Sequence, residues 1–197
     1  EYVEIVKRVE SVSSDIVAYE VNISCPNVSR GGMQFGVDCE LTYKLTEKLR
    51  SITERPLIIK LTPNVTDIAA IAQSAEEGGA DAISAINTVV GMSIDIHTRK
   101  SHISTKYSGL SGPAIRPIGI ASVYKIFKSV NIPVIGIGGI TNSEDIIEYI
   151  LAGSLAVQIG TSNFRDPGIS VSILEDLVSY LEQNNYSTLG NLVGGVL

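Results

Sequence analysis

Residues 16–27 read IVAYEVNISCPN, a β-branched apolar run that ends in polar residues. A short run rich in Val and Ile is typical of a strand buried on both faces of a parallel sheet. Four later stretches have the same character: 57–61 (LIIKL), 82–86 (AISAI), 133–137 (PVIGI) and 155–159 (LAVQI). The sequence therefore predicts five strands of one parallel sheet.

Helical patterns separate these strands, at about the length that a parallel crossover requires. They cover 39–52, 67–79, about 112–129, a segment that starts at 143, and about 170–183. Thr66 is positioned to cap the second of them, and Gly78 and Gly79 to end it. Residues 1–10 also have an amphipathic helical pattern, whereas 89–110 lacks one and favours antiparallel strands. The alternation of strand and helix predicts an α/β fold.

Polar or glycine-rich residues follow every predicted strand at its C-terminal end, where (β/α) barrels build their sites. This favours a TIM (β/α)8 barrel over an open, doubly wound sheet. Five βα units would be the C-terminal portion of such a barrel, with the first strands missing. The chain also begins without Met. We therefore expect residues 1–197 to form a single, partial barrel domain.

The bulk composition narrows the class of protein. The chain is 44% hydrophobic and carries a net charge of −6, with Lys and Arg dispersed along it. Dispersed cations argue against binding to nucleic acid or to an anionic membrane surface, and no apolar run is long enough to span a bilayer. The two cysteines form neither a disulfide framework nor a metal-ligand pattern, so we expect a reducing, cytoplasmic setting and no metal.

Two stretches carry reactive or charged groups at strand ends. Asn22 and Asn27 bracket Cys25, and two carboxamides could hold a small polar ring while the sulfur acts on one carbon. A buried structural thiol is the alternative. Lys60 stands in an apolar strand, where an ammonium is costly unless it is paired, so it is expected to face a polar site or to extend to water.

Paired glycine turns follow the last two strands. Gly138-Gly139 and Gly160-Thr161 match the place where barrels hold a phosphate on bare backbone amides. Asn87-Thr88 follows the third strand and favours ligand contact or a simple turn. Gly112 lies in a loop that could pack against a flat ring or only lead into a helix.

The order of these motifs resembles that of the class 1 dihydroorotate dehydrogenases. Residues 22–27 (NISCPN) resemble the NxSCPN signature of that family, and the likeness extends over nearly the whole chain. The further matching segments are Leu61-Thr62-Pro63-Asn64, Ile86-Asn87-Thr88, Asp95 with Thr98-Arg99, 109–115 (GLSGPAI), 137–140 (IGGI) and 158–161 (QIGT).

That resemblance implies a TIM-barrel enzyme that oxidises dihydroorotate to orotate in de novo pyrimidine (UMP) biosynthesis, with FMN as cofactor. Cys25 would be the general base of the reaction. The residues implied in binding substrate are Asn22, Asn27, Asn87 and Thr88. Those implied in binding FMN are Lys60, Ile86, Gly112, Gly138, Gly139, Gly160 and Thr161.

Residues 28–36 (VSRGGMQFG) look closest to the subtype that reduces NAD through an iron–sulfur, FAD-bearing electron-transfer subunit. The resemblance thus implies a cytoplasmic homodimer that also binds such a subunit. Two other interpretations remain open. One is the related pyrimidine-reducing module of dihydropyrimidine dehydrogenase, which has a similar SCP motif, and the other is a non-catalytic phosphate-binding barrel.

Overall fold

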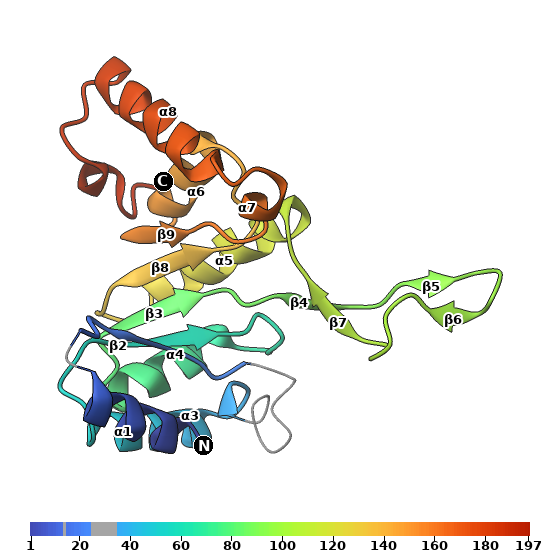
Figure 1. Cartoon of the computed structure of the whole chain (residues 1–197). Coiled ribbons are helices and arrows are strands. Elements are labelled where there is room, and N and C mark those ends of the chain that lie inside the picture. The colour runs from blue at the N-terminus through green and yellow to red at the C-terminus, as the bar shows by residue number, and fades with distance from the viewer. Residues whose placement is uncertain (14, 25–34) are drawn as a thin grey trace.

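A five-stranded parallel sheet forms the centre of the computed structural model, which describes residues 1–13, 15–24 and 35–197 (Figure 1). Its strands lie in the order β1 (Tyr19–Asn22), β2 (Leu57–Leu61), β3 (Ala82–Ala85), β8 (Val134–Ile137) and β9 (Ala156–Gln158). Every neighbouring pair is parallel. The predicted parallel sheet is confirmed, although β1 begins three residues later than predicted, where the Tyr19 amide donates to Pro56 O.

The strands neighbour one another in chain order, with no reversal. A doubly wound sheet reverses its strand order at a switch point, so this arrangement differs from that alternative. Consecutive βα units wound in one direction give the observed order, because right-handed crossovers place each new strand beside the last.

The helices also neighbour one another in chain order. Contacts join α3 (Cys39–Arg50) to α4 (Ile68–Glu77), α4 to α5 (Arg116–Phe127), α5 to α6 (Ser143–Leu151), and α6 to α8 (Ile169–Gln183). The first helix, α1 (Tyr2–Val12), packs on α3. This helical layer covers the sheet, so the strand side chains that face it are buried.

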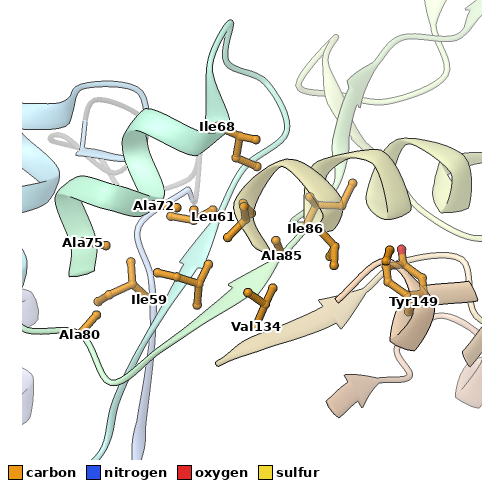
Figure 2. Close-up of a cluster of buried hydrophobic side chains, with 14 of the residues drawn as sticks. Ile59, Leu61, Ile68, Ala72, Ala75, Ala80, Ala85, Ile86, Val134 and Tyr149 are labelled. Atoms are coloured by element: carbon orange, nitrogen blue, oxygen red, sulfur yellow. The ribbon is translucent and has the colours of Figure 1, made fainter. Parts of the chain in front are cut away.

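Alternate strand residues form the core under this layer. Ile59 and Leu61 of β2 are fully buried and lie beside Ala72 and Ala75 of α4 (Figure 2). The neighbouring strand adds Ile83, also fully buried. Because side chains alternate across a strand, the residues between these positions face away from the helices.

Helix boundaries differ from the sequence prediction at three points. Asp67, not Thr66, caps α4, because its carboxylate accepts hydrogen bonds from the Ala69 and Ala70 amides at 3.0 and 3.2 Å. A 3-10 turn, η1 (Pro113–Ile115), precedes α5, which ends at Phe127. The four-residue helix α7 (Ser162–Arg165) was not predicted, since one turn has no readable period.

An antiparallel arm extends from the sheet between β3 and η1 (Figure 1). Strand β4 (Val89–Gly91) pairs with β7 (Ser108–Leu110), and β5 (Ile94–Asp95) pairs with β6 (Lys100–Ser101). At its tip, the Thr98 and His97 amides donate to Asp95 and lower the pKa of that carboxyl. The predicted antiparallel insertion over 89–110 is confirmed.

A final 3-10 turn, η2 (Leu189–Leu192), lies near the C-terminus.

Within 1–13, 15–24 and 35–197, none of the helices combines the length and the apolar character that a membrane crossing requires. The same residues hold no group of three or more His, Cys, Asp or Glu arranged to bind a metal ion.

We predict that Ile83→Ala lowers the free energy of unfolding by about 2–5 kcal/mol, because it opens a cavity in the middle strand of the sheet. Urea unfolding of the full-length protein measures this loss. Ile96→Ala is the matched control, since Ile96 is 79% exposed and its truncation should change the free energy by less than about 0.5 kcal/mol. Equal losses in both variants would contradict the assignment of the core.

Candidate functional site

A cavity of about 140 Å³ lies at the C-terminal ends of β2, β3, β8 and β9. Its walls come from residues that are distant in the sequence and meet only because parallel strands end at one edge. The lining residues are Lys60, Ile86, Asn87, Thr88, Ser111, Gly112, Ile115, Ile137, Gly138, Gly139, Ile140, Gly160, Thr161 and Ser162. They include all seven residues that the sequence analysis associates with a cofactor.

A larger hollow of about 720 Å³ lies on the outer surface, between α5, α6 and the C-terminal residues. Apart from Tyr124 and Glu148 it is lined mainly by apolar side chains. It lacks the convergent polar groups that distinguish a ligand site, so the cavity at the strand ends is the stronger candidate.

The turn after β8 requires glycine. Gly138 and Gly139 have φ of 125° and 73°, in the region that other residues avoid. A Cβ on Gly139 would also lie 2.8 Å from the Cβ of Arg116 and 2.9 Å from Gly112 O. Such close contacts leave room for backbone alone at this wall of the cavity.

Backbone amides are available at this wall. Within the part of the chain that the structure describes, the amides of Gly139, Gly160 and Thr161 donate to no protein acceptor. A Cβ built on Gly160 would have no other heavy atom within 4 Å, so the backbone there borders open space. Unpaired amides beside a cavity form a suitable cradle for an anion.

The side chain of Tyr149 in α6 contacts the backbone carbonyl groups of the glycine turn. Its hydroxyl donates to Gly138 O at 2.8 Å and lies 3.2 Å from Ile137 O. The ring is fully buried, and burial raises the pKa of the phenol, so the hydroxyl keeps its proton. Because C=O and N–H point in opposite directions across a trans peptide, holding Gly138 O turns the Gly139 N–H away from α6.

Arg116 stands beside the turn, but its charge is already paired. Its guanidinium forms ion pairs with Asp145 and, at 3.1 Å, with Glu148. The second carboxylate oxygen of Asp145 accepts from the amide and hydroxyl of Thr141, at 2.7 and 2.8 Å. Arg116 is therefore held by acidic partners, so the backbone amides of the turn are better suited to meet an anion than this guanidinium.

Polar side chains from β1 and from the segment after β3 meet next to the cavity. Asn22 Oδ1 accepts from the Ser24 hydroxyl at 2.6 Å and from Asn87 Nδ2 at 3.3 Å. Asn87 Nδ2 also donates to Ser24 Oγ at 2.6 Å, and Asn87 Oδ1 accepts from the Thr88 amide at 2.9 Å. Asn22, Asn87 and Thr88 thus come together, whereas Cys25 and Asn27 lie outside the described residues.

Asn64 is a site residue to which the sequence analysis gave no role. Its side chain donates to Thr88 O at 3.0 Å and accepts from the Val90 amide at 2.9 Å. A second hollow of about 190 Å³, lined by Ser24, Asn64, Thr88 and the base of the arm, adjoins it. The available signal was the position of Asn64 after Lys60 in the motif Leu61-Thr62-Pro63-Asn64.

Lys60 is paired with Glu20, a second residue that the sequence analysis did not assign. Its Nζ lies 3.3 Å from Glu20 Oε1, and Glu20 Oε2 accepts from Gln158 Nε2 at 2.5 Å. Lys60 therefore has polar surroundings, which is one of the two environments that the sequence predicted for it. The signal available in the sequence was a glutamate inside an apolar strand. It lies two residues before Asn22 and therefore on the same face of the strand.

Comparison with known proteins identifies relatives over the whole chain. The family model described as dihydroorotate dehydrogenase matches residues 1–181. A protein of Caldicellulosiruptor saccharolyticus named "Dihydroorotate dehydrogenase B (NAD(+)), catalytic subunit" is 50% identical over 196 residues, 100% of this chain and 64% of that protein. A protein of Malacoplasma penetrans with the same name is 46% identical over 194 residues, 98% of this chain and 63% of that protein. The chain therefore spans just under two thirds of the length of these relatives.

A solved structure shares the fold. The structure described as "Crystal structure of DHODH in complex with ferulenol from Eimeria tenella" superposes with a TM-score of 0.80 at 22% identity, over 97% of this chain and 57% of that chain. At this identity the likeness concerns the fold alone.

We predict that Tyr149→Phe lowers the free energy of unfolding by about 1–3 kcal/mol, because it removes the hydroxyl that donates to the Gly138 carbonyl oxygen. Thermal or urea unfolding of the full-length protein measures the change. Tyr124→Phe is the matched control, because Tyr124 is 39% exposed. A Tyr149→Phe variant as stable as the control would contradict the role of this hydroxyl.

Proposed function

Because this chain belongs to the dihydroorotate dehydrogenase family, we propose that its protein oxidises dihydroorotate to orotate in de novo pyrimidine (UMP) biosynthesis, with FMN as cofactor. The observation that carries the proposal is the cavity at the strand ends, which all seven expected cofactor residues line. An enzyme of this kind is a flavin-dependent oxidoreductase that acts on a CH–CH bond.

The residues at the two ends of the cavity match the chemistry of the phosphate and of the ring of FMN. The amides of Gly139, Gly160 and Thr161, which donate to no acceptor among the described residues, would hold the phosphate together with Gly138. The open space beside Gly160 leaves room for it. Lys60, Ile86 and Gly112 line the same cavity and would contact the ring. Bound FMN supplies the ring nitrogen that accepts a hydride.

The carboxamide cluster would bind the substrate. Asn87 donates to Asn22 and to Ser24, and Ser24 donates to Asn22. A polar pyrimidine ring can replace these bonds with equivalent ones. Thr88 and Asn27 would complete the set. Cys25 would remove a proton from the substrate carbon next to the one that loses hydride. The sequence motif supports the roles of Cys25 and Asn27.

The fold proposed for the domain is a TIM barrel, of which residues 1–197 form a single, partial, FMN-binding piece. The edge strands β1 and β9 of a flat five-stranded sheet would lie about 19 Å apart. Yet Glu20 of β1 and Gln158 of β9 form a hydrogen bond of 2.5 Å. The curvature that this contact requires supports the barrel, as do the strand order and the shared fold of the Eimeria tenella structure.

The proposed assembly is a homodimer in the cytoplasm that pairs with an iron–sulfur, FAD-bearing electron-transfer subunit and passes electrons to NAD. The printed names of the relatives, which include "NAD(+)" and "catalytic subunit", support a partner of this kind. The net charge of −6 with dispersed cations supports the absence of nucleic-acid and membrane partners.

Anaerobic mixing of the purified full-length protein with dihydroorotate tests the function. Loss of the oxidised flavin absorbance together with formation of orotate is the expected result, and uracil with a nicotinamide donor should give no turnover. A purified protein without a yellow flavin spectrum would refute the proposal, and so would turnover of uracil in place of dihydroorotate.

We predict that Cys25→Ser slows reduction of the flavin by dihydroorotate by about 10²- to 10⁴-fold, the usual contribution of a general base. Stopped-flow absorbance measures the rate. Cys39→Ser serves as the control, because Cys39 is exposed at the start of α3. FMN content should remain native in both variants, and an unchanged rate for Cys25→Ser would exclude Cys25 as the base.

We predict that Gly139→Ala weakens FMN binding about tenfold or more, because a Cβ at positive φ costs about 1–2 kcal/mol and would also press on Arg116 and Gly112. Fluorescence titration of the apoprotein with FMN gives the affinity. Gly168→Ala is the matched control, since Gly168 is exposed with an ordinary φ of −86°. Equal affinities for FMN in the two variants would argue against the phosphate cradle.

A further inference from the structure

An ion pair lies on the face of the sheet that points away from the helices. The register aligns Asn22 of β1 with Lys60 of β2. Since Val21, Ile59 and Leu61 are buried in the core with the helices, the alternation of side chains places Glu20, Asn22 and Lys60 on the opposite face. In a barrel this face is the interior.

Both oxygens of the Glu20 carboxylate have partners. Oε1 lies 3.3 Å from Lys60 Nζ, and Oε2 accepts from Gln158 Nε2 at 2.5 Å. The side chains of Lys60 and Glu20 are only 20% and 27% exposed. The two side chains are partly shielded from water, and the two contacts of the carboxylate fix its position between β2 and β9.

Of these three side chains, only Lys60 lines the cavity at the strand ends. Glu20 does not line the cavity but contacts Lys60, which does, and Gln158 connects the carboxylate to the last strand. A ligand in the cavity would meet the ammonium together with the field of the carboxylate that partly offsets its charge.

We propose that Glu20, anchored by Gln158, is a positioning residue that sets the charge which Lys60 presents to the flavin ring. This inference rests on the proposed function, since it requires FMN in the cavity. Positive charge beside a flavin ring favours states in which the ring gains negative charge. Glu20 lowers that effect and so holds the flavin at a lower reduction potential than an unpaired Lys60 would.

Sulfite binding to the oxidised flavin tests this effect without turnover, because the adduct places negative charge on the ring. The holoprotein is compared with its Glu20→Gln variant, which has nearly the same shape and lacks the charge. We expect sulfite to bind about threefold to tenfold more tightly to Glu20→Gln, as removal of one unit charge several ångströms away predicts. The midpoint potential of the flavin should rise in parallel.

Two controls separate charge from packing. Glu20→Asp keeps the charge and should restore most of the wild-type sulfite affinity. Glu40→Gln removes a carboxylate from an exposed ion pair with Lys44 on α3 and should leave sulfite affinity unchanged. Equal sulfite affinity in wild type and Glu20→Gln would overturn the inference, and so would equal increases in Glu20→Gln and Glu20→Asp.

Gln158→Leu provides a second measurement if Glu20→Gln fails to retain flavin. It removes one anchor of the carboxylate without changing any charge, so sulfite affinity should rise in the same direction by a smaller factor. An unchanged affinity in Gln158→Leu would then overturn the inference. Failure of the proposed function is distinguishable, because in that case the wild-type protein itself would lack flavin or would not oxidise dihydroorotate.

Discussion

Parallel pairing of the strands in chain order is the constraint on which this structure depends. It directs every strand toward the same edge, so that residues at the ends of β2, β3, β8 and β9 meet although Lys60 and Ser162 are about a hundred positions apart in the sequence. The helical layer buries one face of the sheet and supplies the apolar area that stabilises this arrangement. The opposite face carries polar groups, among them Glu20 and Lys60, beside apolar ones such as Ile58 and Ile135.

The site divides into two chemically distinct halves. Toward β8 and β9, the backbone of the glycine turns, with amides that donate to no acceptor in the described ranges, is suited to an anion. Tyr149 contacts this backbone at Gly138 O and Asp145 contacts it at the Thr141 amide. Toward β1 and β3, the carboxamides of Asn22 and Asn87 form a neutral hydrogen-bonding cluster with Ser24. Lys60 and its partner Glu20 lie between them. A cofactor with an anionic tail and a polar ring substrate match these two halves.

The sequence alone determined the alternation of strand and helix, the antiparallel arm and the positions of the glycine turns. These features depend on local chemistry: β-branched runs, the helical period, and backbone conformations that only glycine adopts readily. The family could also be identified from the order of short motifs. The misplaced cap at Thr66 and the unpredicted helix α7 show where local signals are weakest, because adjacent residues compete for a cap and one helical turn has no period.

Only the tertiary structure decided which side chains pair. Nothing near Glu20 in the sequence indicates Lys60 or Gln158, which are 40 and 138 positions away. Likewise, Tyr149 reads as an ordinary core residue until its hydroxyl is found on Gly138 O. Hydrogen bonds and ion pairs form over about 3 Å, and the distances between side chains from separate strands follow from the curvature and register of the sheet, which depend on the packing of the chain as a whole.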